Sequence, residues 1–262
     1  STRRLLGYGN QRFRQHLHQV DQGPSMPLLG VDASHHAFEV TSFALRVGYR
    51  HFVLDFQKMR TFGRSLFESQ IPRKNVFLST RIPKDILGYR HSTRVLQKIQ
   101  EEMPGGYADL CLVPGNAITL PAERAGTWHA LEEAFDERIC LSIGVSNYTV
   151  SHLDEMIHYA RIEPSVNQIE FAPFMPVREL VEYCQDRNIT VQAFGWMHEE
   201  ILTDLSVEKR AGEFRATPLT PSQFVTLCFL SQNIAPLFSP NEASELMEHA
   251  EVVELENNCF DW

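Results

Sequence analysis

The chain has 262 residues, 43% of them hydrophobic, and a formal net charge of -9 at pH 7. This length and apolar content suffice for one substantial core, while the acidic balance argues against nucleic-acid binding, which needs clustered Lys and Arg. No apolar run reaches the roughly 18 residues of a membrane-spanning helix, so we expect no transmembrane segment.

The first residues differ in character from the rest of the chain. Within residues 1–20 there is no acid, and the first carboxylate is Asp21. The basic residues there are Arg3, Arg4, Arg12 and Arg14. Such a segment is typical of an organellar targeting sequence, and equally of a flexible basic arm that contacts a partner. We predict a basic N-terminal arm over residues 1–25, before the domain pattern begins near Met26.

From residue 26 onward, short apolar runs alternate with amphipathic segments, an order that is typical of βα units around a parallel sheet. The predicted strands are residues 28–31, 50–54, 76–80, 110–113, 142–145, 165–169, 190–194 and 234–237. The predicted helices are residues 38–47, 93–103, 127–135, 150–160, 176–187, 220–232 and 241–249. Eight strands with intervening helices predict a (β/α)8 TIM barrel, whose function lies on the loops at the carboxyl ends of the strands.

The cysteines are scattered along the chain without a CxxC pair. They are Cys111, Cys140, Cys184, Cys228 and Cys259. Most lie in apolar stretches, which indicates small buried side chains in a reducing compartment. We therefore predict reduced cysteines, with neither a disulfide nor a zinc site.

A series of short motifs, in this order and at this spacing, resembles the aldo-keto reductase family over about residues 26–256. The motifs are Met26-Pro27-Leu28-Leu29-Gly30, Gly48-Tyr49-Arg50-His51, residues 72–78, 109–112 and 128–133, Gly144-Val145-Ser146-Asn147-Tyr148, Val166-Asn167-Gln168-Ile169-Glu170, and Thr220-Pro221-Ser222-Gln223. The resemblance implies a TIM barrel of the aldo-keto reductase type with a shortened C-terminal part, followed by a short tail over residues 257–262. It also implies hydride transfer from NADPH to a carbonyl. In that family a Tyr donates the proton, a Lys paired with an Asp tunes the Tyr, and a His orients the carbonyl.

Two strand ends depart from what the resemblance implies. Arg81 stands where the family places its Lys, and a planar guanidinium cannot act as a compact titratable ammonium. Pro114 stands where the family places its His, and a proline side chain can neither orient a substrate nor carry a proton.

The segment after His51 lacks the family's Asp and Tyr. Aligned on His51, the Asp position is Val53, the Tyr position falls near Lys58, and the next tyrosine is Tyr89. A shift of the alignment brings Asp55 toward the Asp position, but no phenol follows it. Residues that act as a catalytic unit fail together, so these departures predict a barrel without reductase activity, a pseudoenzyme with no catalytic residues.

Four positions on the cofactor side remain similar to the family. Ser146, Asn147 and Gln168 match residues that hold the nicotinamide amide, and Phe194 stands where an aromatic ring stacks on the nicotinamide. The alternative interpretation is structural: Ser146 and Asn147 close a strand-to-helix turn, while Gln168 and Phe194 fill the barrel mouth.

The phosphate side argues against tight NADP(H) binding. Leu237 replaces the Lys that clamps the adenosine phosphates in the family, and the next helix opens with Asn241, Glu242 and Glu245 where the family has an Arg. Losing two charge-assisted contacts of about 1.5–3 kcal/mol each weakens affinity by several orders of magnitude. We expect no bound cofactor and only a vestigial NADP(H) pocket.

These observations predict a catalytically inactive barrel that is a structural or regulatory subunit of a larger protein complex. Similar barrels of the family, the potassium-channel β subunits and the regulatory subunit of glutamate–cysteine ligase, serve partners in this way. The predicted contacts with other subunits are the N-terminal arm and the C-terminal aromatic residues Phe260 and Trp262, which are costly to expose. The Arg-rich start and the reduced cysteines suit the mitochondrial matrix, with the cytoplasm as the alternative.

Two other functions stay open. One is an NADP(H)- or small-molecule-sensing protein that holds a ligand at the four family-like positions without turnover. The other is a diverged oxidoreductase that uses Asp55, Arg81 or histidines. His35 and His36 follow the first predicted strand, but no partner shows metal-ligand spacing, so we predict no metal. His51 belongs to a strand motif and is expected to be an interior packing residue.

Overall fold

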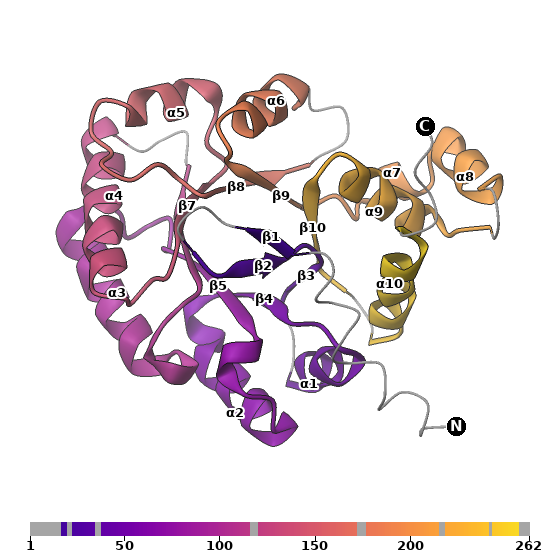
Figure 1. Cartoon of the computed structure of the whole chain (residues 1–262), viewed down its shortest axis with the longest axis horizontal. Coiled ribbons are helices and arrows are strands. Elements are labelled where there is room, and N and C mark those ends of the chain that lie inside the picture. The colour runs from indigo at the N-terminus through magenta and orange to yellow at the C-terminus, as the bar shows by residue number, and fades with distance from the viewer. Residues whose placement is uncertain are drawn as a thin grey trace.

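Eight parallel strands close into a barrel with helices around it, as the computed structural model shows (Figure 1). The structure describes residues 17–19, 23–34, 38–115, 120–171, 177–214, 218–240 and 243–256. Around the barrel the strands follow one another in the order β10, β3, β4, β5, β6, β7, β8, β9. The predicted (β/α)8 barrel is therefore confirmed.

The barrel strands lie within two residues of their predicted bounds. They are β3 (Gly30–Asp32), β4 (His51–Leu54), β5 (Phe77–Arg81), β6 (Leu110–Pro114), β7 (Ile143–Ser146), β8 (Val166–Glu170), β9 (Thr190–Phe194) and β10 (Ile234–Phe238). Six of the eight run one residue further at the carboxyl end than predicted. The backbone ladder continues past the last residue of the apolar pattern, and in most of these strands it ends on a polar side chain.

The helices cover the outside of the barrel (Figure 1). They are α1 (Phe38–Val47), α2 (Met59–Ser69), α3 (Tyr89–Glu102), α4 (Pro121–Asp136), α5 (Val150–Met156), α6 (Arg178–Asp186), α7 (Glu199–Leu202), α8 (Leu205–Gly212), α9 (Pro221–Ser231) and α10 (Ala243–Glu256). Short 3₁₀ helices are η3 (Phe56–Lys58), η4 (Arg73–Asn75) and η5 (Pro104–Gly106). The hydroxyl of Thr220 accepts a hydrogen bond from the backbone N–H of Gln223, so Thr220 caps the first turn of α9.

Three helices were not predicted from the sequence: α2, α7 and α8. Helix α2 buries Met59, Phe62 and Leu66 on one face, which is helical spacing. Gly63 in the middle of this segment weakens the helical signal, because glycine is a poor helix former. Helix α7 has only 4 residues and none of them is buried, so it carries no apolar periodicity.

An antiparallel hairpin precedes the barrel. Strand β1 (Leu17–Gln19) pairs with β2 (Ser25–Pro27), so the predicted boundary between arm and barrel falls inside β2. The carbonyl oxygen of Pro27 lies 2.9 Å from Nδ1 of His51, which places β2 against the amino-terminal end of β4. The arginines of the predicted arm and the tail residues Phe260 and Trp262 lie outside the described residues.

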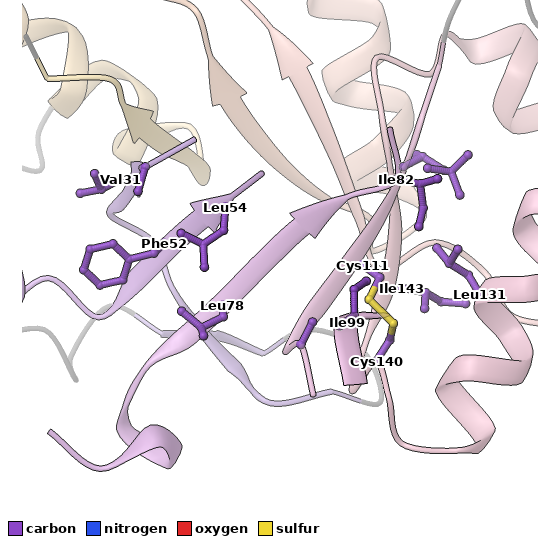
Figure 2. Packing of buried hydrophobic residues seen from close by; sticks show 14 of the residues in the cluster. Val31, Phe52, Leu54, Leu78, Ile82, Ile99, Cys111, Leu131, Cys140 and Ile143 are labelled. Atoms are coloured by element: carbon purple, nitrogen blue, oxygen red, sulfur yellow. A yellow bond between two sulfur atoms is a disulfide. The ribbon is translucent and has the colours of Figure 1, made fainter. Parts of the chain in front are cut away.

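A disulfide joins Cys111 of β6 to Cys140, and both residues are fully buried. Figure 2 shows it among Ile99, Leu131 and Ile143, between the barrel and its helices. The prediction of reduced cysteines is wrong for this pair. Parallel pairing sets residue 108 beside 140 and residue 111 beside 143, which brings the two thiols within reach although 29 positions separate them in sequence. Cys184 and Cys228 are free, and Cys259 lies outside the described residues.

Neither a membrane span nor a metal cluster occurs in the part of the chain that the structure describes. No helix there is both long and apolar enough to cross a bilayer. No group of three or more His, Cys, Asp or Glu side chains among those residues could hold a metal ion. His35 and His36, which were considered for a metal, lie outside the described residues.

Candidate functional site

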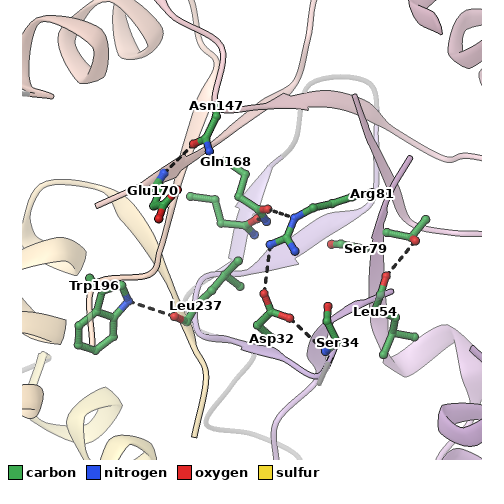
Figure 3. A network of polar contacts seen from close by, with 12 residues as sticks. Asp32, Ser34, Leu54, Ser79, Arg81, Asn147, Gln168, Glu170, Trp196 and Leu237 are labelled. Carbon is green, nitrogen blue, oxygen red and sulfur yellow. Dashed lines mark hydrogen bonds and ion pairs between the residues drawn. The ribbon is translucent and has the colours of Figure 1, made fainter. Parts of the chain in front are cut away.

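The carboxyl ends of β3, β5 and β8 meet in a polar network at one end of the barrel (Figure 3). Arg81, the last residue of β5, is at its centre. Its Nε donates to Oε1 of Gln168 at 2.5 Å, and its Nη2 lies 3.1 Å from Oδ2 of Asp32. The guanidinium carbon also lies over the ring of Phe194, 5.1 Å from its centroid. We call these four residues the mouth network.

Asp32 neutralises Arg81 in a mostly buried ion pair, in which the side chains are 13% and 20% exposed. Burial works to raise the pKa of Asp32. The charge of Arg81 and hydrogen bonds from Ser34 outweigh this effect, so the pKa of Asp32 lies below its ordinary value. The carboxylate is therefore ionised at neutral pH, and the pair has no net charge.

Asp32 is a residue that sequence reasoning missed. The carboxylate beside Arg81 comes from β3 and not from Asp55, which lies at the end of β4, before η3. The proposed shift of Asp55 into that role is therefore wrong. One signal was available: Asp32 directly follows a predicted strand, as Arg81 does, and parallel strands in a barrel bring their carboxyl ends together.

A chain of buried side chains continues from the mouth network down the inside of the barrel. Nε2 of Gln168 donates to Oε1 of Gln192 at 2.5 Å, and Nε2 of Gln192 lies 3.3 Å from Nε2 of His51. The other ring nitrogen of His51 faces the Pro27 carbonyl, which can only accept, so Nδ1 carries the hydrogen. Nε2 is then the acceptor for Gln192, and the hydroxyl of Ser79 lies 3.2 Å from the same atom.

His51 is fully buried, as expected for an interior packing residue. Its burial lowers its pKa to about 4, despite the opposing hydrogen bond to Pro27, so the ring is neutral at pH 7. A neutral ring with a fixed tautomer sets the direction of the hydrogen bonds above it. Gln192 must turn its amide oxygen toward Gln168, and Gln168 must turn its own oxygen toward Arg81.

The two other predicted pocket residues lie at the end of β7 and directly after it. Asn147 has a left-handed backbone with φ of 55°, and its Oδ1 accepts from the backbone N–H of Glu170 at 2.9 Å. Ser146 is buried and pairs with Gln168 in the strand ladder, while its carbonyl accepts from Gly115. Gln168 and Phe194 thus come together around Arg81, whereas the Asn147 side-chain oxygen is bonded to the backbone of the neighbouring strand β8.

The other positions that the alignment on His51 and the strand ends assigned to the family's catalytic residues hold neither a phenol nor an imidazole. Val53 is fully buried within β4, Lys58 ends η3, and Pro114 ends β6. No tyrosine hydroxyl forms a hydrogen bond with the mouth network among the residues that the structure describes. The hydroxyl of Tyr49, for example, donates to the carbonyl of Leu246 in the core at 3.0 Å.

Aromatic rings pack between the end of β10 and the helices α9 and α10, next to the position that the resemblance assigned to the family's phosphate clamp. The buried side chain of Leu237 stands at the Lys position, and its carbonyl accepts from Nε1 of Trp196 at 3.0 Å. Phe238 packs on Trp196 and on His249, with ring centroids 5.4 Å and 4.1 Å apart. Asn241 and Glu242 lie outside the described residues.

Among the residues that the structure describes, two features do not fit a bound NADP(H). The amide oxygen of Gln168 and the face of Phe194, which would hold a nicotinamide, are both in contact with Arg81. At the other end, a leucine side chain offers a phosphate no charge and no hydrogen bond.

The chain matches the family described as the Aldo/keto reductase family over residues 35–252. It is 26% identical over 247 residues to the glyoxal reductase of Bacillus subtilis (strain 168), covering 91% of this chain and 87% of that protein. It is 32% identical over 157 residues to the 9,11-endoperoxide prostaglandin H2 reductase of Trypanosoma cruzi (strain CL Brener), which covers 58% of this chain and 54% of that protein.

Solved structures share the fold. The aldo-keto reductase MGS-M4 from a Medee basin deep-sea metagenome library superposes with a TM-score of 0.83 at 24% identity, covering 94% of this chain and 90% of that chain. An aldo/keto reductase from Brucella melitensis superposes with a TM-score of 0.81 at 22% identity, covering 94% and 93%.

Proposed function

We propose, for a chain that belongs to the aldo/keto reductase family, that the barrel does not reduce carbonyls by the tyrosine-dependent hydride transfer of that family. The observation that carries this proposal is the mouth network, in which Arg81 at the family's Lys position bonds to Gln168 and Asp32 and lies over Phe194. A guanidinium holds its proton at neutral pH and cannot serve as the family's titratable ammonium.

The missing proton donor supports the same proposal. Reduction of a carbonyl needs an acid within hydrogen-bond reach of the developing alkoxide. A phenol, with an ordinary pKa of about 10, fills that role only when a neighbouring cation lowers its pKa. Val53, Lys58 and Pro114 occupy the positions where the family's acid and its helpers would stand, and none of them supplies a phenol or an imidazole.

Assays on the purified chain test the proposal. NADPH oxidation is followed by its absorbance with glyoxal and a panel of aldehydes, and the Bacillus subtilis glyoxal reductase is the positive control. We expect no turnover above the buffer rate. We also expect no rise in melting temperature with millimolar NADPH, because a ligand that binds the folded state must stabilise it. Turnover comparable to that of the control enzyme would end the proposal.

A diverged oxidoreductase is the second candidate function. The similar proteins named above are all reductases, and they support this candidate more than a role without chemistry. The same assays separate the possibilities. Turnover indicates an oxidoreductase, and stabilisation by NADPH without turnover indicates a sensing protein that holds its ligand at Ser146, Asn147, Gln168 and Phe194.

Membership of a larger complex, through the N-terminal arm and the C-terminal tail, stays a prediction. Gentle native purification followed by mass spectrometry of co-eluting proteins tests it, and migration as a lone species of 30.1 kDa would count against it. A location in the mitochondrial matrix now rests on the Arg-rich start alone. The disulfide between Cys111 and Cys140 removes the argument from reduced cysteines.

A further inference from the structure

Arg81 contacts a platform that is suited to a flat, amide-bearing ligand. The platform consists of the ring face of Phe194 and the amide oxygen of Gln168. An aromatic face attracts planar and cationic groups, and an amide oxygen accepts an N–H. The guanidinium of Arg81 is planar, charged and rich in N–H donors, so it meets both features at once.

Contacts with Asp32, Gln168 and Phe194 hold the guanidinium in this place. Asp32 supplies the opposite charge from β3, on the other side of the guanidinium from Gln168 (Figure 3). The amide nitrogen of Gln168 donates a hydrogen bond to Gln192, so the amide oxygen of Gln168 faces Arg81. His51 in turn fixes Gln192, because its Nε2 accepts from the amide nitrogen. The acceptor that Arg81 uses is therefore oriented from within the barrel, independently of any ligand.

We propose that the Arg81 side chain is an internal plug, which occupies the platform in place of a nicotinamide ring and its carboxamide. Both groups are flat, both need the Phe194 face, and both donate an N–H to Oε1 of Gln168, so only one of them fits at a time. This inference rests on the proposed function. It explains the absence of hydride transfer by a residue of the chain itself, which occupies the platform. Gln192 and His51 are positioning residues that act through Gln168.

The first experiment removes the plug together with its counter-charge. The double variant Arg81→Ala/Asp32→Asn leaves no unpaired carboxylate at the mouth, and binding of nicotinamide mononucleotide is measured by calorimetry. We expect at least about tenfold tighter binding than in the wild type, because a blocked site lowers the apparent affinity by its open fraction. The matched control is Arg60→Ala/Glu102→Gln, which removes a surface pair whose arginine is 79% exposed and should leave binding unchanged.

Phe194→Ala in the double-variant background checks that the gained site is the platform. This change should abolish the gain, whereas a general loosening of the fold would leave it in place. Circular dichroism establishes that each variant is folded. The inference is wrong if the wild type binds the probe as tightly as the double variant, or if a folded double variant gains nothing.

A measurement on the wild type covers the case in which the double variant does not fold. The Nε–H resonance of Arg81, assigned by its loss in Arg81→Lys, should be shifted by the ring current of Phe194 and should move in Phe194→Leu. A resonance that Phe194→Leu leaves in place overturns the inference. These outcomes are separate from those of the proposed function, which fails on wild-type turnover of NADPH, whatever the double variant binds.

Discussion

Replacing both Cys111 and Cys140 by alanine is expected to lower the free energy of unfolding by about 3–4 kcal/mol. The bond closes a loop between residues 29 positions apart. For a loop of about 30 residues, the cross-link removes about 12 cal/mol/K of entropy from the unfolded chain, or about 3.6 kcal/mol at 25 °C. Both cysteines are fully buried, so a reductant should reach the bond only after the chain unfolds.

Urea unfolding followed by circular dichroism, with and without dithiothreitol, measures this effect. The wild type should lose stability when reductant is present, while the double variant should unfold at the same urea concentration in both buffers. Cys228→Ala is the matched control, since it removes a free, partly buried thiol. The reasoning is refuted if the denatured wild type shows as many reactive thiols before reduction as after it.

Three further changes test the ion pairs and the buried histidine. Arg73→Ala removes the guanidinium that lies 2.7 Å from the buried carboxylate of Asp109, so urea unfolding should show a loss of about 3 kcal/mol or more in the free energy of unfolding. An unchanged unfolding midpoint would contradict this. Because burial lowers the pKa of His51 to about 4, the unfolded chain takes up that proton first, and stability should fall between about pH 6.5 and 4. His51→Gln should flatten that slope, whereas the exposed His91→Gln should not. Asp32→Asn should weaken the loss of stability below about pH 4, since its carboxyl has a lowered pKa and its pairing disappears on protonation; equal acid profiles would rule this out.

The fold was predictable because barrel strands are buried on both faces. Each strand leaves a continuous apolar run in the sequence, and all eight appeared within two residues of their observed bounds. Prediction failed where burial leaves no such run. The apolar face of helix α2 lies in a segment that contains a glycine, which weakens the helical signal, and helix α7 has no buried residue.

The candidate site was predictable only in part. Arg81 and Pro114 stood out because a motif placed them at strand ends. The structure then brought Gln168 and Phe194 to Arg81, but it also supplied Asp32 and Gln192, which no motif singled out. Whether the four family-like positions bind a nucleotide stays a prediction.

The sequence by itself determined which residues stand at the strand ends, Arg81 and Pro114 among them. Only the tertiary structure decided which of those residues meet. Asp32 and Arg81 are 49 positions apart, and Arg81 and Gln168 are 87 apart. Local patterns along a chain record burial and turns, whereas contacts across a closed barrel depend on the stagger of every strand between them, which no short segment encodes.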